Sequence, residues 1–490
     1  MKVSFGTNRD GQPVIFDSDN LINSHALVLG DTGSGKSTFL RRFVVDSLKS
    51  DERIPRTHLF DVHDDFDFPG AQSAVKFSES TDFGFNPLVL NTDPDYGGVR
   101  KRINFFVSAI NRTAHKLGPK QEAALRNLLT DLYEMRGFHP DNPATWNEVF
   151  EHADREDRVY VESAYEERKQ LFDAGGTFDQ EKRAYWFTPE NYAAKGSRWP
   201  VKRFGKTYPS IADLVNFAEQ KLNQIYFGVP QVAMRKLDEF YSATRSLNAK
   251  KQAEVKKAGG INQATMAEIE EQLKKAKQKV IDTFAEHINA VTTGRELTEF
   301  KKYDSAEVLK SVVDRIRNLN AIGIFRASPP PFAHRAPVWN YKIKALGEAE
   351  KCLFVEFRLE EIFKQAMQAG KQTTVTNVVI LDEAHLFMTD EEDHIINRII
   401  REGRKYGLSL ILASQSPDHF QKELLAGVGT KVILGLDRSY TSAVENKMGI
   451  KEQTLNFIQA RKRMVVMFKR SGEKADVVWV NLDYRKDCMG

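Results

Sequence analysis

A glycine-rich turn near the start of the chain limits what this sequence can fold into. It follows an apolar run at residues 26–29, comes directly before Thr38, and reads Gly30, Asp31, Thr32, Gly33, Ser34, Gly35, Lys36 and Ser37. In a strand, loop and helix of this kind, glycines let backbone N–H groups wrap a β-phosphate and the lysine reaches the β and γ oxygens. The final hydroxyl is a ligand for Mg²⁺, and the helix N-terminus adds its positive end. The pattern therefore predicts that residues 30–38 bind ATP, with Mg²⁺ held in part by Ser37.

An acidic motif far downstream completes this prediction. Four apolar residues, 378–381, precede Asp382 and Glu383. Such a run suits a central parallel strand, whose carboxyl end would place both carboxylates beside the phosphate loop. Asp382 is the predicted Mg²⁺ ligand, and Glu383 is the predicted general base for the attacking water. Without the phosphate loop, an acidic pair that merely ends a strand would be the better interpretation.

The spacing of the two motifs excludes some classes of ATPase. About 340 residues separate them, so the sequence predicts a large insertion. Two-domain helicases carry a tetrad like residues 382–385, but they place it closer to the loop and follow it with a second domain. Only about 105 residues follow His385, which is too few, so His385 is predicted to make a local polar contact. SMC-like ATPases need a Leu-Ser-Gly-Gly signature before the acidic strand, and residues 359–363 lack it.

The segment after the acidic strand, residues 399–417, indicates a helix, a glycine turn, a buried strand and a polar tip. Gln415, at the end of this strand, is placed to sense the γ-phosphate or to orient the attacking water. Arg404, near the preceding turn, could reach the nucleotide of a neighbouring subunit and neutralise charge in its transition state. A surface salt bridge explains Arg404 equally well, and Arg401 and Arg438 are alternative candidates for this role.

The turn at 404–407, the apolar strand and the Ser-Gln tip together resemble the HerA/FtsK superfamily of ring-forming motor ATPases. Residues 5–14, 59–65 and 85–88 add short matches, the last resembling an Asn-Pro-Leu element of conjugative and type IV secretion ATPases of the TraC type. The matches cover roughly residues 1–135 and 350–480. The resemblance implies a hexameric ring whose subunits share active sites, with Arg404 acting in trans, and a role in moving DNA.

Composition sets further limits. The 490 residues are 28% charged and include no stretch of 18 apolar residues, so we expect a cytoplasmic protein without a membrane span, which partners could bring to the inner membrane. The net charge of +4 permits contact with DNA without requiring it. Cys352 and Cys488, the two cysteines, cannot form a disulfide framework or a four-ligand zinc site.

Three regions are predicted along the chain. Residues 1–136 form the first half of the core, with a helix pair in 103–135 whose connection contains Pro119. Residues 137–304 form an inserted, mostly helical region: aromatic side chains between 160 and 199 either stack on bases or build a small local core, and a helical hairpin around 231–292 is broken at residues 259–260. Residues 305–490 complete the core with strands at 352–357, 378–381, 408–414, 431–436, 463–468 and 475–480, the last two as a hairpin.

The expected fold is an α/β, RecA-like P-loop NTPase core with a mainly parallel central sheet of about eight or nine strands and a large, mostly helical insertion. The expected function is an ATP-hydrolysing ring motor for DNA translocation or for conjugative or type IV secretion DNA transfer. Two alternatives stay open. One is a protein-traffic or assembly ATPase that never contacts nucleic acid, and the other is the ATPase subunit of an anti-phage defence complex.

Overall fold

The chain forms two compact units. The first is Met1–Pro87, Arg112–Ala114 and Ile322–Gly490, and the second is Leu88–Asn111 and His115–Ala321. The computed structural model describes residues 1–49, 54–113, 116–151, 158–161, 167–180, 182, 184–196, 199, 201–202, 204–227, 239–242, 244–245, 271–275, 277–283, 285, 302–303, 305–326, 328–389, 391–392, 394–470, 472 and 474–482.

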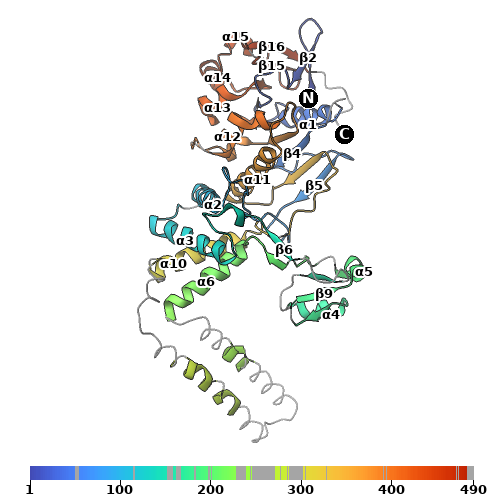
Figure 1. Cartoon of the computed structure of the whole chain (residues 1–490). Helices are drawn as coiled ribbons and strands as arrows, with labels where there is room; N and C mark the ends of the chain where they lie inside the picture. The colour runs from blue at the N-terminus through green and yellow to red at the C-terminus, as the bar shows by residue number, and fades with distance from the viewer. Residues whose placement is uncertain are drawn as a thin grey trace, which may run out of the picture. The chain divides into compact units, whose positions relative to one another are not determined.

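A large sheet forms the centre of the first unit, and within the described residues it has 11 strands (Figure 1). In spatial order these are β2 (Pro13–Asp17), β1 (Lys2–Thr7), β16 (Asp476–Asn481), β15 (Arg463–Phe468), β14 (Thr430–Ile433), β3 (Ala26–Leu29), β13 (Leu408–Ser414), β12 (Asn377–Leu381), β4 (Arg56–Asp61), β11 (Val338–Lys342) and β5 (Gln72–Lys76). The sheet is larger than the sequence predicted because edge strands such as β2 and β5 are short and partly exposed, without a continuous apolar run.

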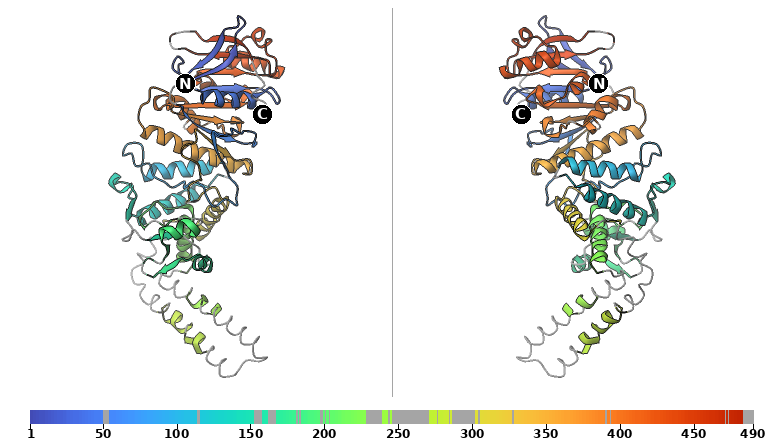
Figure 2. Two further views of the ribbon diagram at one scale, coloured as in Figure 1. Left: turned by 90° about the vertical axis from the view of Figure 1, so that its right-hand side faces the viewer. Right: turned by 90° about the vertical axis from the view of Figure 1, so that its left-hand side faces the viewer.

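The direction of the strands divides the sheet into two parts. From β14 to β5 each strand runs parallel to its neighbours, whereas β15, β16, β1 and β2 pair antiparallel. Figure 2 shows the blue start of the chain and its orange final third contributing to this one sheet. β3 and β13 are buried along their whole length, which is typical of parallel strands covered on both faces. The predicted α/β core with a mainly parallel sheet is therefore confirmed.

Helices cover both faces of the sheet. On one face, α1 (Lys36–Ser47) packs Phe39, Leu40 and Phe43 into a core shared with most of the strands. On the other, α11 (Glu348–Gln368) packs Phe354 at 6.3 Å, between ring centroids, from Phe60 of β4. The neighbouring helix α12 (Ile395–Glu402) contacts both α11 and β13. This two-sided burial gives the loop after β3 a rigid support.

One predicted strand is a helix. Residues 352–357, expected as a strand containing Cys352, lie inside α11. The helix starts after Gly347, whose N–H donates to Glu350 Oε2 at 2.8 Å. Because α11 contacts α12, the segment after β12 and the segment before β13, it is buried on several sides. Its apolar stretch at 352–355 therefore shows no clean helical period and resembles a buried strand.

The other elements of the first unit agree better with the predictions made from the sequence. They are η4 (Ala384–Phe387), η5 (Gly403–Tyr406), η6 (Pro417–His419), α13 (Lys422–Gly427), η7 (Arg438–Tyr440), α14 (Thr441–Met448) and α15 (Glu452–Leu455). The predicted succession of helix, glycine turn and strand is α12, η5 with Gly407 (φ 69°), and β13. The predicted C-terminal hairpin is β15 with β16, in register from Arg463 opposite Asn481 to Phe468 opposite Asp476.

Helices dominate the second unit. It holds most of α2 (Val99–Thr113), together with α3 (Pro119–Met135), α6 (Ile211–Phe227) and α10 (Ala306–Ala321), the last three packed against one another. Shorter elements are η1 (Pro143–Thr145), α4 (Arg168–Asp173), α5 (Pro189–Asn191) and η3 (Tyr192–Gly196). Pro119 is the first residue of α3 rather than part of the connection, a position where its missing N–H costs nothing.

Two small sheets complete this unit. β6 (Val149–Glu151) pairs with β10 (Phe204–Lys206), and β9 (Ala184–Phe187) lies between β7 (Val159–Val161) and β8 (Thr177–Asp179). Val161, Leu171, Phe187 and Trp199 form a buried cluster there. For Phe187 and Trp199, the small local core is therefore the right interpretation, and base stacking is the wrong one.

The predicted helical hairpin around 231–292 falls mainly outside the described residues, as do residues 259–260 at its break. The pieces of it that are described, 239–242, 244–245, 271–275, 277–283 and 285, are helical. None of the helices in the described part of the chain is both long enough and apolar enough to span a membrane.

Candidate active site

The predicted phosphate loop leaves the carboxyl end of β3 and ends at the first turn of α1. Gly35 is the N-cap residue of α1 at φ 102° and ψ 21°, a left-handed conformation that favours glycine. Gly35 offers no side chain to cap the helix, so the N–H groups of the first turn, which includes Ser37 and Thr38, face the loop opening. A helix start of this kind binds anions through its N–H groups and its dipole.

The loop is tightly curled against the neighbouring strand. Gly30 N–H donates to Ser414 O of β13 at 3.1 Å, and Ser34 N–H donates to Asp31 O at the same distance. A Cβ atom on Gly30 would lie too close to Ser34 Oγ, so the Ser34 side chain would have to move if another residue replaced this glycine. Thr32 and Gly33 form the exposed outer side of the loop.

Lys36 meets the acidic motif inside the protein. Its Nζ lies 3.3 Å from Glu383 Oε1, and both side chains are nearly buried. Glu383 itself sits at φ 50°, a left-handed conformation that is uncommon for a residue with a side chain and that clusters at functional sites. Two motifs that lie 347 positions apart in the sequence therefore form one charged contact.

Asp382 lies beside this contact at the end of β12. Burial and the adjacent Glu383 carboxylate raise the pKa of Asp382 to about 6. Asp61 is the last residue of the neighbouring strand β4. In the register of these two strands Leu381 is opposite Phe60, so Asp61 and Asp382 follow at the same level. Its carboxylate accepts the N–H groups of Asp65 at 3.1 Å and Phe66 at 3.0 Å. The sequence matched residues 59–65 to the family without assigning a role to Asp61, and the register makes Asp61 a neighbour of the site.

The donor set at this edge fits Mg²⁺. The Asp382 carboxylate and the Ser37 hydroxyl are hard oxygen ligands, and a buried pair of carboxylates is stabilised by a cation. Glu383 Oε2 is buried without a hydrogen-bond partner among the described residues. That part of the chain also contains no cluster of three or more His, Cys, Asp or Glu side chains able to hold a metal ion alone.

Gln415 follows β13, between the strand of the phosphate loop and the acidic strand. Two histidines contact each other near this strand end, His419 after β13 and His385 after β12. Ser414 Oγ lies 2.8 Å from His419 Nδ1, and the rings of His419 and His385 stack at 4.7 Å. His385 Nδ1 is 3.3 Å from Glu383 Oε2, so His385 makes the local polar contact that the sequence predicted. His419 has no sequence motif and was missed.

Arg404 lies at the other edge of the sheet. It belongs to η5, before the first residue of β13, and donates to Ile22 O while its side chain remains exposed. The length of β13 puts it on the order of 20 Å from the phosphate loop of its own chain. Arg401 shares this edge at the end of α12, whereas Arg438 in η7 follows β14 at the phosphate-loop edge. The structure therefore does not bring Arg404 into its own site.

A further arginine contacts the phosphate loop. Arg461, in the turn before β15, donates through its backbone N–H to Ser34 O at 3.2 Å and through Nε–H to Gly33 O at 3.1 Å. Sequence reasoning missed it, because no motif marks a residue 428 positions after the glycine that it contacts.

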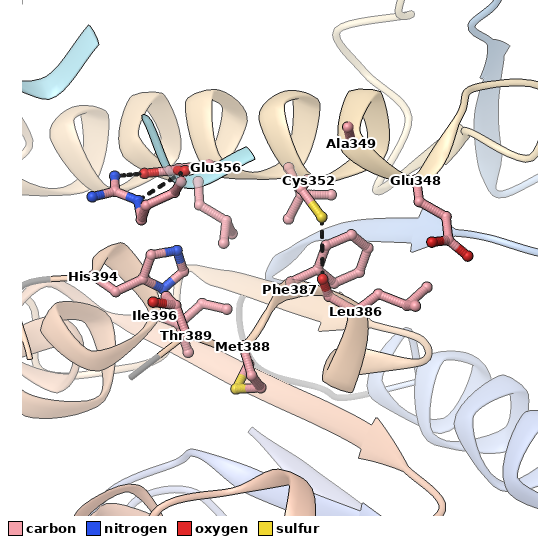
Figure 3. Close-up of a pocket in the computed structure, with 13 residues that line it drawn as sticks. Glu348, Ala349, Cys352, Glu356, Leu386, Phe387, Met388, Thr389, His394 and Ile396 are labelled. Atoms are coloured by element: carbon pink, nitrogen blue, oxygen red, sulfur yellow. Dashed lines mark hydrogen bonds and ion pairs between the residues drawn. The ribbon is translucent and has the colours of Figure 1, made fainter. Parts of the chain in front are cut away.

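A cavity of about 300 Å³ lies behind the acidic motif, between α11 and the segment after η4 (Figure 3). Cys352 Sγ–H donates to Leu386 O at 3.1 Å, and Arg112 forms an ion pair with the buried Glu356. Burial raises the pKa of the Cys352 thiol to about 11, which keeps it a weak nucleophile at neutral pH.

Comparisons with known proteins bear on this geometry. The family model described as "Helicase HerA, central domain" matches residues 2–343, a stretch that includes the phosphate loop and ends before Asp382. The DNA double-strand break repair helicase HerA of Pyrococcus furiosus is 41% identical over 79 residues, 15% of this chain and 14% of that protein. The matched segments span less than a fifth of the length of the curated relatives.

Solved structures resemble the whole chain. VirB4 of Thermoanaerobacter pseudethanolicus matches 100% of this chain and 98% of its own, with a TM-score of 0.57 and 12% identity. The plasmid coupling protein TrwB, solved in complex with ADP and Mg²⁺, matches 98% of this chain and 90% of its own, with a TM-score of 0.45 and 10% identity. With 12% identity and a TM-score of 0.57, the similarity to VirB4 shows a shared fold alone.

Proposed function

The chain belongs to the HerA central-domain family of P-loop ATPases, and from that premise we propose that it is an ATP-hydrolysing ring motor that moves DNA. In this proposal six copies form the ring, residues 1–136 and 305–490 form the motor, and residues 137–304 are the insertion. Conjugative or type IV secretion DNA transfer, in the cytoplasm or at the inner membrane through partners, is the setting that the sequence resemblance favours.

The observation that carries the proposal is the buried contact between Lys36 and Glu383, 3.3 Å between Nζ and Oε1. A lysine that binds the β and γ phosphate oxygens must leave this carboxylate. Nucleotide binding then frees Glu383 to accept a proton from water, so the two roles are linked through one ion pair. Burial of the pair keeps both groups in place before the substrate arrives.

The remaining residues take roles that their positions support. Backbone N–H groups of residues 30–38 surround the phosphates, and Ser37 and Asp382 would hold Mg²⁺. When bound, Mg²⁺ would neutralise the negative charge that develops on the phosphate oxygens during hydrolysis. Gln415, at the end of the strand between the other two motifs, orients the water or senses the γ-phosphate.

Arg404 is assigned to the neighbouring subunit's site. Its position at the far edge of the sheet prevents action in its own site, while its exposure leaves it available to a second copy. An arginine supplied in trans is a recurring device in P-loop ATPases, where it neutralises transition-state charge. A ring of copies would bring this edge of one subunit to the loop edge of the next.

Two substitutions test the hydrolytic assignment. Lys36→Ala should abolish ATP binding, whereas Glu383→Gln should bind ATP and lower kcat by about 10²–10⁴-fold, the contribution of a general base. Glu423→Gln, an exposed carboxylate on α13, is the matched control. Ordinary turnover by Glu383→Gln would refute the assignment of the base.

DNA as the moved polymer requires its own experiment. Turnover should rise when double-stranded or single-stranded DNA is added, and the effect should weaken with salt because phosphate contacts release counterions. The relative from Pyrococcus furiosus is named as a DNA repair helicase, which favours this outcome. An ATP turnover rate that does not change when DNA is added at low salt would favour the protein-traffic or defence-complex alternatives.

A further inference from the structure

The turn before β15 has an unusual backbone. Arg461 adopts φ 62°, in the left-handed region that few residues with a Cβ atom occupy. Two hydrogen bonds close the turn: Gln459 O accepts Lys462 N–H at 2.9 Å and Arg463 N–H at 2.8 Å. A non-glycine residue held in this conformation persists only where its surroundings require it, and such residues cluster at functional sites.

Both hydrogen bonds from Arg461 end on backbone oxygens of the phosphate loop. The backbone N–H donates to Ser34 O and Nε–H donates to Gly33 O. In a planar trans peptide the carbonyl and the following N–H point in opposite directions. Holding Ser34 O outward therefore turns Gly35 N–H toward the inside of the loop, where a phosphate would lie. The left-handed conformation at residue 461 presents the N–H and the side chain to the loop together.

The turn is also fixed from its other side. Arg463 lies over the Phe457 ring at 5.3 Å, and Arg9, between β1 and β2, lies over the rings of Phe457 at 5.2 Å and Trp479 at 3.4 Å. Such cation–π contacts stabilise a surface turn without extra burial. The support for Arg461 thus exists before a nucleotide binds.

We propose that Arg461 is a positioning residue for the phosphate loop, which fixes the Gly33–Ser34 and Ser34–Gly35 peptide planes so that the loop is pre-organised for nucleotide phosphates. The inference rests on the proposed function, because it names a determinant of the same nucleotide site. It differs from a trans-acting arginine: Arg461 acts within its own chain and through the loop backbone. Its loss should weaken binding more than it slows chemistry, because the hydrolytic groups are untouched.

The test compares Arg461→Gly with Lys462→Ala. Glycine keeps the left-handed turn and its backbone N–H, and it removes the side chain with its charge and its Nε–H donor. Lys462 shares the turn, is exposed and carries the same charge, so Lys462→Ala controls for the loss of a positive charge. ATP affinity, measured with a fluorescent analogue, should fall roughly tenfold in Arg461→Gly, the worth of one charge-assisted hydrogen bond. KM for ATP should rise by about the same factor with kcat nearly unchanged, and Lys462→Ala should match the native protein. If Arg461→Gly does not fold, Arg461→Asn serves instead, since asparagine tolerates this conformation.

Each outcome decides the inference. An ATP affinity of Arg461→Gly within about twofold of the native protein would overturn it. A melting temperature of Arg461→Gly well below that of the native protein, measured without nucleotide, would also overturn it. Arg461 would then stabilise the fold in general. If the native protein and Lys36→Ala both fail to bind ATP, the proposed function falls as well. If Lys36→Ala alone loses binding, only the role of Arg461 is wrong.

Discussion

The two edges of the parallel part of the sheet are built differently. At the carboxyl edge, Lys36, Asp382 and Glu383 are nearly buried and interact with one another. At the amino edge, Arg404 is exposed and contacts the backbone oxygen of Ile22. The carboxyl edge has charged groups and a positive helix start assembled within one chain. The amino edge presents the exposed guanidinium of Arg404 on the protein surface.

Strand direction explains this difference. In parallel strands, all carboxyl ends meet at one edge, and the following helices begin there with their N–H groups exposed. Side chains that follow β3, β12, β13 and β4 therefore converge, however far apart they lie in the sequence. Residues that precede the same strands converge at the opposite edge, where helices end. Under the proposed function, one edge binds the phosphates and the other completes the site of a neighbouring subunit.

The largest expected effect is on the exposed edge. Arg404→Ala should lower kcat by about 10³–10⁵-fold if the side chain serves a neighbouring subunit, because transition-state charge would go unpaired. ATP binding by the isolated subunit should remain, since the loop edge is intact. Turnover and ATP affinity, each measured against Lys405→Ala, check this prediction.

Mixing variants would sharpen the contrast between the edges. Glu383→Gln and Arg404→Ala damage opposite edges, so a mixed ring contains some interfaces where both groups are native. Turnover should then exceed that of either variant alone. If mixing restores nothing and Arg438→Ala reproduces the loss instead, the trans role belongs to the loop edge and the comparison fails.

A smaller effect is expected for Gln415, on the buried edge. Gln415→Ala should lower kcat by about 10²-fold, the usual cost of one lost donor at a reacting group, with ATP affinity nearly unchanged. Gln368→Ala, at the exposed end of α11, is the matched control. A rise in KM with normal kcat would show that Gln415 only binds substrate.

The smallest expected effect is the response of the buried edge to pH. Because the pKa of Asp382 is raised to about 6, the folded state without Mg²⁺ holds this proton more tightly than the unfolded state does. As pH falls from 7 to 5, Asp382 should therefore add about 1 kcal/mol of stability. Mg²⁺-dependent ATP binding needs the ionised carboxylate, so it should weaken below pH 6.

Melting temperature and ATP affinity, measured from pH 4.5 to 7.5, should thus change in opposite directions. The matched variant is Asp382→Asn, which has no proton to exchange and should lose both trends. If Asp382→Asn follows the native profile, other groups cause the dependence.

Much of the site could be predicted from the sequence, for physical reasons. The phosphate loop needs glycine at fixed positions, and a buried parallel strand must be apolar until its polar tip, so Lys36, Asp382 and Glu383 stand out. Residues 352–357 were misassigned because a helix buried on several sides also reads as an apolar run. Arg461 could not be found, since its contacts depend on a left-handed turn and on chain pairing that no local pattern records.

The place of β3 in the sheet has a consequence during protein synthesis. Its two neighbours, β13 and β14, are translated only after residue 407. At about 5–20 residues per second, a ribosome needs on the order of 20–80 s to supply them. Throughout that interval β3, which leads into the phosphate loop, has both backbone edges unpaired and its apolar side chains uncovered. Unpaired strands of this kind promote aggregation and recruit chaperones. Nascent chains of this protein should therefore depend on chaperones until the last third has emerged.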